Sequence, residues 1–116
     1  MSKKVLILGG AGFIGFNIAK HLTENRDYQI TIADNFMKKN RDAEFDQLVS
    51  EYNIKVIEDD FSYPEAYMKL DNNYDQVYMM AAFVGVDNAN NKPHEVIRIN
   101  TSLTLYTLEW IRRSTI

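Results

Sequence analysis

The feature that most restricts the fold of this chain is the segment VLILGGAGFIGFNIAKHL at residues 5–22. A short aliphatic run, typical of a buried strand, leads into four glycines, and Ile14, Ile18 and Leu22 then recur at spacing four, as on one face of a helix from about 13 to 25. Glycine permits a tight turn and lets a phosphate approach the backbone, and the helix that follows directs free N–H groups and its positive dipole end at that phosphate. The G-x-G-x-x-G spacing therefore predicts a dinucleotide-binding turn between a strand and a helix.

Strand and helix patterns alternate along the rest of the chain. Pro64 stands where a short helix would begin, with Ser62 as a possible cap. The expected strands are 4–8, 28–34, 53–59 and 75–82, the expected helices are about 13–25, 42–52, 64–70 and about 94–113, and the expected loops include 35–41 and 83–93. The side chains expected to face the core from the second and last helices are Phe45, Leu48, Val49, Tyr52, Val96, Ile99, Leu103, Tyr106 and Trp110.

This alternation indicates the fold class. Strands that alternate with helices form βαβ units with right-handed crossovers and a parallel sheet. We expect one domain over residues 1–116, a Rossmann-type α/β sheet with helices on both faces and four strands in the order 3-2-1-4, which is an incomplete doubly wound fold.

Composition excludes several classes of function. A net charge of −3 argues against a nucleic acid or an anionic membrane as a partner recognised through bulk charge. The sequence has no cysteine, which excludes disulfides and zinc–thiolate sites. Its apolar runs are too short for a signal peptide or a membrane span, so a cytoplasmic protein is expected. We expect no metal site, because the contiguous acids Glu58, Asp59 and Asp60 at a strand end cannot converge on one ion.

Asp34 indicates which dinucleotide would bind. It ends the second expected strand, 22 residues beyond Gly12, where an acid would hold the ribose hydroxyls of a dinucleotide. A carboxylate at this place repels a 2′-phosphate, so NAD is favoured over NADP. The basic run Lys38, Lys39 and Arg41 could in principle bind that phosphate, but a solvated loop is the preferred interpretation.

With these features in place, the chain resembles the N-terminal part of an extended short-chain dehydrogenase/reductase, and more narrowly the NAD-dependent epimerase/dehydratase family. Five motifs carry the resemblance, in order: GGAGFIG (9–15), ADN (33–35), EDDF (58–61), MAAFVG (80–85) and IRINTSLTLYTLEWIRR (97–113). Two positions depart from the family pattern. Leu8 stands where the family usually has threonine, and Tyr63 stands where it often has a second acid.

The resemblance implies a set of residues that hold NAD. Asp60 would meet the adenine amino group with Phe61 beside the ring, the end of the fourth strand would line the nicotinamide side, and Asn100 would be a buried amide that supports the cofactor loop. The expected cofactor-binding residues are Gly9, Gly12, Phe13, Ile14, Gly15, Asp34, Asn35, Phe36, Asp60, Phe61, Ala81, Ala82, Phe83 and Asn100.

The resemblance also shows which chemistry is missing. The family's catalysis uses a Tyr-x-x-x-Lys pair and a Ser/Thr on a fifth strand, but no tyrosine in this sequence has a lysine four residues later. No catalytic residue is therefore expected in this chain. The leading hypothesis is the NAD-binding portion of a nucleotide-sugar epimerase, dehydratase or reductase, which moves a hydride between NAD and a sugar carbon. The alternative is a stand-alone, non-catalytic dinucleotide-binding or scaffolding module; a methyltransferase is disfavoured by the motifs at 58–61 and 80–85.

The fourth expected strand predicts a further property. In a complete family member a fifth strand covers it, whereas here its apolar segment would form an open sheet edge, which recruits other chains. We therefore expect self-association by edge pairing through residues 76–82 or by exchange of the last helix.

Overall fold

The computed structural model describes residues 2–25, 27–36, 42–83 and 86–116. The basic run Lys38, Lys39 and Arg41 and the last two residues of the MAAFVG motif lie outside these ranges. In chain order the elements are β1 (Lys3–Leu8), α1 (Phe13–Leu22), β2 (Tyr28–Asp34), α2 (Ala43–Tyr52), β3 (Lys55–Glu58), the 3₁₀ helix η1 (Pro64–Lys69), β4 (Gln76–Met79), α3 (Val86–Asn91) and α4 (Pro93–Arg113).

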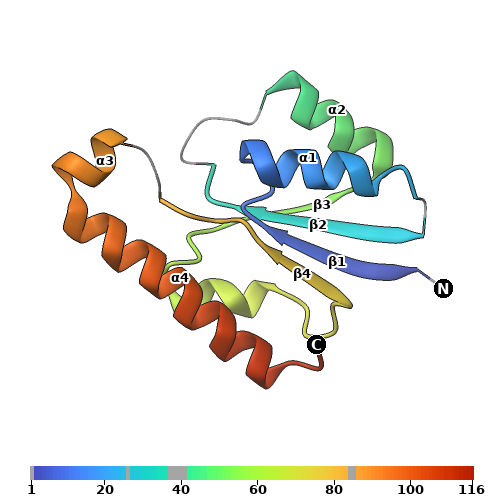
Figure 1. Cartoon of the computed structure of the whole chain (residues 1–116). Coiled ribbons are helices and arrows are strands. Elements are labelled where there is room, and N and C mark those ends of the chain that lie inside the picture. Colours follow the sequence, from blue (N-terminus) through green and yellow to red (C-terminus); the bar gives the residue numbers. More distant parts are fainter. Residues whose placement is uncertain (1, 26, 37–41, 84–85) are drawn as a thin grey trace.

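The four strands form one parallel sheet in the order β3-β2-β1-β4, which confirms the predicted topology (Figure 1). In the register of the sheet, Val5 of β1 is opposite Ile30 of β2 on one side and Gln76 of β4 on the other. Thr31 of β2 is in turn opposite Lys55 of β3. Because all the strands run in the same direction, their carboxyl ends meet at one edge of the sheet.

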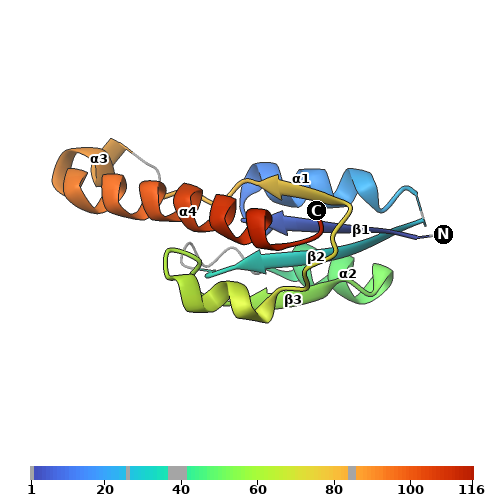
Figure 2. The same cartoon turned by 90° about the horizontal axis from the view of Figure 1, so that it is seen from below.

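Helices cover both faces of the sheet, as expected. On one face α1 and α2 pack against Val5 and Ile7, and on the other η1 and α4 pack against Leu6 and Leu8. All four side chains are almost completely buried, because successive side chains of β1 point to opposite faces. Figure 2 shows that α3 and the beginning of α4 extend past the carboxyl ends of the strands. Of the predicted core residues of α2 and α4, Val96 is only half-buried and lies outside both cores. The others pack in the two cores, namely Phe45, Leu48, Val49, Tyr52, Ile99, Leu103, Tyr106 and Trp110.

The expected face of α1 is confirmed only in part, because Leu22 is buried and Ile18 packs against the core, whereas Ile14 does not. Ile14 is 64% exposed, and the buried residues of the helix are Gly15, Ala19 and Leu22. The helix begins so close to the glycine turn that only a residue without a side chain fits at position 15. Small residues therefore face the sheet at this end of α1, and the larger side chain of Ile14 points away from it.

Three local predictions also differ from the structure. The expected loop at 83–93 contains the short helix α3, whose last turn continues toward α4 through a hydrogen bond from the N–H of Lys92 to the carbonyl of Asn88. Ser62 does not cap η1, which begins after Tyr63 without a side-chain cap. β3 begins at Lys55 rather than at 53, because Asn53 adopts a left-handed conformation that ends α2.

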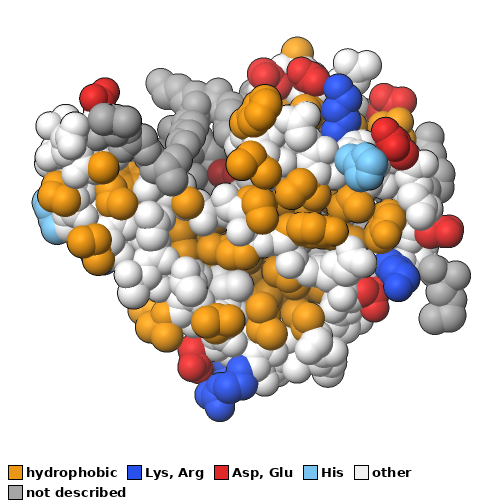
Figure 3. Space-filling view, viewed as in Figure 1, with side chains coloured by type: hydrophobic (Ala, Val, Ile, Leu, Met, Phe, Trp, Pro, Cys, Tyr) orange, Lys and Arg blue, Asp and Glu red, His pale blue; other side chains and the backbone are white. Residues whose placement is uncertain are grey.

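Apolar surface remains on the side where β4 forms the edge of the sheet. All four residues of β4 are only half-buried, and within the described sheet β4 pairs with β1 alone. Ile97, Leu105 and Leu108 on the outer side of α4 are more than half exposed. Figure 3 shows apolar side chains gathered over the middle of this face, where β4 and the adjoining part of α4 lie. No helix in the described part of the chain is long and apolar enough to cross a membrane.

Candidate functional site

A pocket of about 710 Å³ opens at the carboxyl ends of the strands. Its walls come from the glycine turn, the segments that follow β2, β3 and β4, and one side of α4. Every predicted cofactor-binding residue except Phe36 and Asn100 lines it. Among the described residues, the lining is Gly9, Gly12, Phe13, Ile14, Gly15, Ala33, Asp34, Asn35, Asp59, Asp60, Phe61, Met80, Ala81, Ala82, Phe83, Asn88, Lys92, Ile99 and Leu103.

Two glycines of the turn are required by the packing of the chain itself. Gly9 has φ +84°, which favours glycine, and a Cβ atom there would lie 2.5 Å from the main-chain nitrogen of Ala81. A Cβ atom on Gly15 would overlap the carbonyl oxygen of Gly9. These two residues bring the start of α1 and the end of β4 against the turn, so their absence of a side chain is explained without any ligand.

Gly12 is different, because the fold does not require glycine there. Its φ of −72° and ψ of 169° are open to any residue, and a Cβ atom would make only an ordinary contact, 3.4 Å from the carbonyl oxygen of Gly9. The space beside Gly12 belongs to the pocket. A glycine that the protein does not need, facing an open pocket, fits a group that must come close to the backbone.

The N-terminus of α1 supplies donors at the same place. Gly12 is the N-cap residue and has no side chain with which to cap the helix. Among the described residues, nothing accepts a hydrogen bond from the main-chain N–H groups of Phe13, Ile14 and Gly15. These donors and the positive end of the helix dipole form a site suited to an anion, and the helix of ten residues is long enough for a developed dipole.

Asp34 connects the end of β2 to the glycine turn. One carboxylate oxygen, Oδ2, accepts a hydrogen bond from the N–H of Ala11 at 3.0 Å, and the other, Oδ1, accepts one from the N–H of Phe36 at 2.8 Å. Each oxygen keeps a second lone pair for a ligand hydroxyl. Phe36 itself turns away from the pocket, since its ring packs edge-on against Phe45 of α2 with 5.6 Å between centroids.

The two acids after β3 have different partners. Asp59 forms an ion pair with Lys69 at 2.9 Å, and the hydrogen bond from this ammonium, together with one from the N–H of Asp60, lowers the pKa of Asp59. Asp60 Oδ1 accepts hydrogen bonds from the N–H and the hydroxyl of Ser62, at 3.0 and 2.6 Å. Asp60 Oδ2 has no partner among the described residues, so Asp60 is the acid that is open to a ligand.

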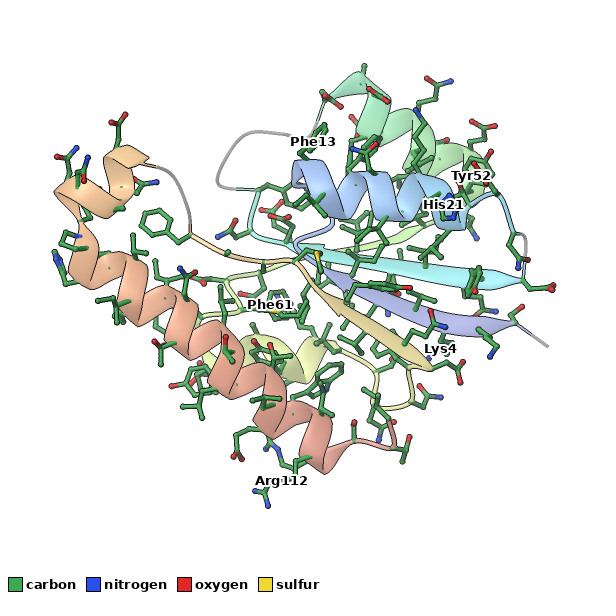
Figure 4. All side chains as sticks on the ribbon, viewed as in Figure 1. Lys4, Phe13, His21, Tyr52, Phe61 and Arg112 are labelled. Atoms are coloured by element: carbon green, nitrogen blue, oxygen red, sulfur yellow. The ribbon has the colours of Figure 1, made fainter. Side chains whose placement is uncertain are left out.

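Phe61 forms part of the floor of the pocket. Its ring is buried between the sheet and the helices, and Figure 4 shows it on the α4 side of the strand ends, with Phe13 at the start of α1 on the opposite side. In the described part of the chain nothing accepts a hydrogen bond from the main-chain N–H of Phe61. Its carbonyl oxygen accepts a hydrogen bond from the hydroxyl of Tyr67 at 2.9 Å.

Asn100 acts on the pocket through the main chain. Its Oδ1 accepts a hydrogen bond from the N–H of Phe83 at 2.8 Å, and its Nδ2 donates one to the carbonyl oxygen of Phe83 at 3.1 Å. This pair of bonds joins the segment after β4 to α4. The amide therefore supports the pocket wall without lining it.

Charge in the pocket is unevenly distributed. Asp34, Asp59 and Asp60 line it, and Lys92 is the one basic residue in its described lining. These carboxylates can accept hydrogen bonds from hydroxyl and amino groups of a ligand, whereas a phosphate fits best at the start of α1.

The lining residues that were not among the predicted site residues are Ala33, Asp59, Met80, Asn88, Lys92, Ile99 and Leu103. Ile99 and Leu103 were predicted as core, and the same apolar stripe of α4 continues from the core into the pocket wall. Lys92 and Asn88 come from the segment predicted as a loop, where no residue pattern indicated which side chains would face the site.

Comparison with known proteins places this architecture in a family. Residues 5–116 match the profile of the NAD dependent epimerase/dehydratase family. A UDP-N-acetyl-alpha-D-glucosaminuronate decarboxylase from Bacillus cytotoxicus is 36% identical over 100 residues, which are 86% of this chain and 30% of the relative.

Solved structures agree with the sequence match. The UDP-Glc/GlcNAc 4-epimerase from Campylobacter jejuni superimposes with a TM-score of 0.86 at 25% identity, over 97% of this chain and 34% of the epimerase. A mutant UDP-glucuronic acid 4-epimerase from Bacillus cereus, solved with UDP-4-deoxy-4-fluoro-glucuronic acid and NAD, gives 0.82 at 26% identity, over 96% of this chain and 37% of that protein.

The chain thus spans about a third of the length of these relatives. The family depends on NAD, in agreement with the cofactor that the sequence predicts. The match over residues 5–116 confirms the resemblance, and the chain belongs to the NAD dependent epimerase/dehydratase family.

Proposed function

We propose that this chain binds NAD in the pocket at the carboxyl ends of its strands, as the NAD-binding portion of a nucleotide-sugar epimerase, dehydratase or reductase. The observation that carries the proposal is Gly12, which the fold does not require and which stands beside unpaired helix N–H groups. The relatives that share this architecture are named as nucleotide-sugar enzymes, and one of them was solved with NAD bound.

Each wall of the pocket would hold one part of NAD. The pyrophosphate fits at Gly12 and the first turn of α1, and the adenosine ribose fits at Asp34, whose oxygens keep free lone pairs. The adenine amino group fits at Asp60 Oδ2, and the N–H of Phe61 would donate to a ring nitrogen. The nicotinamide half would lie along Ala81–Phe83, which Asn100 holds in place.

Bound NAD would supply the chemistry of hydride transfer to and from a sugar carbon. The residues of this chain would bind and orient the dinucleotide. The carboxylate of Asp34 would repel the 2′-phosphate of NADP. No residue in the described pocket forms the Tyr-x-x-x-Lys pair that the family uses, so we propose that the 116-residue chain alone binds NAD without catalysing the reaction.

Titration of the purified chain with NAD and with NADP tests the proposal. Saturable binding of NAD with weaker binding of NADP supports it, and the absence of NAD binding by a folded chain would refute it. Sequencing the reading frame beyond Ile116 separates the two forms of the proposal. A continuation with a Tyr-x-x-x-Lys pair indicates the enzyme, and a stop codon indicates a stand-alone binding module.

We also propose that the chain associates with itself through the β4 edge or α4. The half-buried strand β4 and the exposed side chains of Ile97, Leu105 and Leu108 on α4 support this. Light scattering at several concentrations, with hydrogen exchange on residues 76–82, tests it. A monomer at all concentrations whose β4 amides exchange freely would refute it.

A further inference from the structure

A buried polar cluster lies directly behind the part of the pocket proposed to hold adenine. The hydroxyl of Tyr67 in η1 is 2.9 Å from the carbonyl oxygen of Phe61, 2.9 Å from the hydroxyl of Thr107 and 3.4 Å from the carbonyl oxygen of Leu103. Tyr67 and Thr107 are each 4% exposed. One side chain thus connects η1 and α4 to the loop that follows β3.

The position of this hydroxyl is fixed by packing. The ring of Tyr67 lies edge-on to Phe61 at 5.2 Å and tilted against Trp110 at 6.2 Å. Burial raises the pKa of Tyr67, so the hydroxyl is protonated at neutral pH and can donate. A buried phenol held on both sides keeps its hydroxyl at these three oxygens, of which the carbonyl oxygen of Phe61 is the one in the loop after β3.

Besides the packing of the Phe61 ring in the core, the loop has few described hydrogen bonds to the body of the protein. The side-chain hydrogen bonds of Asp60 run to Ser62, and the N–H of Tyr63 donates to the carbonyl of Asp60, all within the loop. Ahead of it, the N–H of Asp59 is bonded to Asp34 and its carboxylate to Lys69. Among the described hydrogen bonds of Asp60 and Phe61, only the one from the hydroxyl of Tyr67 comes from another secondary-structure element.

From this arrangement we infer that Tyr67 is a positioning residue for adenine recognition. Its hydroxyl holds the main chain at Phe61 so that the carboxylate of Asp60 and the N–H of Phe61 face the edge of the adenine ring together. The inference rests on the proposed NAD-binding function and adds the source of base selectivity. Hypoxanthine carries an oxygen where adenine carries the amino group and a ring N–H where adenine has an acceptor, so the same two groups would reject it.

The test compares two dinucleotides and three variants of the full chain. Tyr67→Phe removes only the hydroxyl. Tyr74→Phe is the matched control, because Tyr74 is similarly buried and packs against the same Trp110, but its hydroxyl accepts a hydrogen bond from the N–H of Asp71 rather than holding the loop after β3. Affinities for NAD and for its analogue with hypoxanthine in place of adenine are measured by calorimetry. Circular dichroism confirms that each variant is folded.

We expect Tyr67→Phe to reduce the preference for NAD over the hypoxanthine analogue by about five- to tenfold, the effect of one lost hydrogen bond, and Tyr74→Phe to leave this ratio unchanged. Thr107→Val removes a second partner of the same hydroxyl and should reduce this ratio of affinities by a smaller factor. If Tyr67→Phe does not fold, the ratio measured for Thr107→Val tests the inference in its place. An unchanged ratio in the folded variants would overturn the inference, as would an equal loss of affinity for both dinucleotides. Failure of the wild-type chain to bind NAD would instead refute the proposed function.

Discussion

Replacement of Gly12 by valine separates what a ligand requires from what the fold requires. The backbone of Gly12 is extended, which suits valine, and a Cβ atom there meets only the carbonyl oxygen of Gly9 at 3.4 Å. The loss of glycine as N-cap costs stability, while the reduced freedom of the unfolded chain restores some of it, each by about 0.5–1 kcal/mol. We therefore expect the free energy of unfolding to change by less than about 1 kcal/mol.

The expected effect on binding is much larger. The branched side chain would fill the space in which a phosphate must approach the N–H groups of Phe13 and Ile14. Hydrogen bonds to a charged group contribute about 1.5–3 kcal/mol each, so losing two of them weakens NAD binding by at least about two orders of magnitude. With ordinary cofactor concentrations, this loss abolishes measurable binding.

Gly15→Ala provides the opposite case. Its Cβ atom would overlap the carbonyl oxygen of Gly9, which belongs to the backbone and cannot move aside cheaply. Overpacking of this kind costs about 1–3 kcal/mol, so this variant should lose stability as well as binding. Urea unfolding and NAD titration of both variants make the comparison. If Gly12→Val binds NAD as tightly as the wild type, the phosphate does not lie at this turn and our interpretation of the glycines is wrong.

Three further substitutions test the connections around the pocket. Asp34→Ala should weaken NAD binding by about 1.5–3 kcal/mol and reduce the difference in affinity between NAD and NADP, because it removes a charged acceptor and the hydrogen bond to the N–H of Ala11. Titration with both cofactors measures this change. An unchanged affinity for NAD would mean that Asp34 is not part of the site. Asn100→Ala should cost about 1–3 kcal/mol of stability, since it leaves the N–H and carbonyl of Phe83 unpaired, and faster hydrogen exchange at Phe83 would locate the change. The lowered pKa of Asp59 means that its ion pair with Lys69 stabilises the fold above the usual aspartate pKa and is lost as the pH falls through the lower value in the folded state. Urea midpoints between pH 5 and pH 2 should therefore fall less steeply in Lys69→Met than in the wild type, and identical slopes would contradict this assignment.

The order of the strands was predictable because it depends on few physical rules. Alternating strands and helices require parallel pairing, and right-handed crossovers leave 3-2-1-4 as the arrangement of a doubly wound sheet. The faces of α2 and α4 were also predictable, since large apolar side chains at helical spacing have few alternatives to the core.

The errors arose where the site disturbs these rules. The pattern at Ile14, Ile18 and Leu22 holds for the last two, which pack in the core. At the start of the helix, however, close approach to the turn places Gly15 rather than Ile14 against the sheet. Ile14 instead lines the pocket. An apolar side chain beside a ligand site cannot be distinguished by periodicity from one in the core.

Connections between distant segments were not predictable from the sequence. Tyr67 and Thr107 are 40 residues apart in the sequence, and their hydrogen bond depends on how η1 and α4 pack against each other on one face of the sheet. The short helix α3 was missed because its polar composition is that of a loop.

The pocket is built from main-chain segments, and each is tied to a neighbour by one side chain. Asp34 holds the glycine turn to β2, Tyr67 holds the loop after β3 to η1 and α4, and Asn100 holds the segment after β4 to α4. All three ties are made between residues that the structure describes. The walls of the proposed dinucleotide site are therefore set by the same packing that forms the sheet and its helices. This arrangement supports the proposal that the chain binds NAD without help from residues that would act on a sugar, because the donors and acceptors proposed for the cofactor are held in place by contacts within residues 9–107.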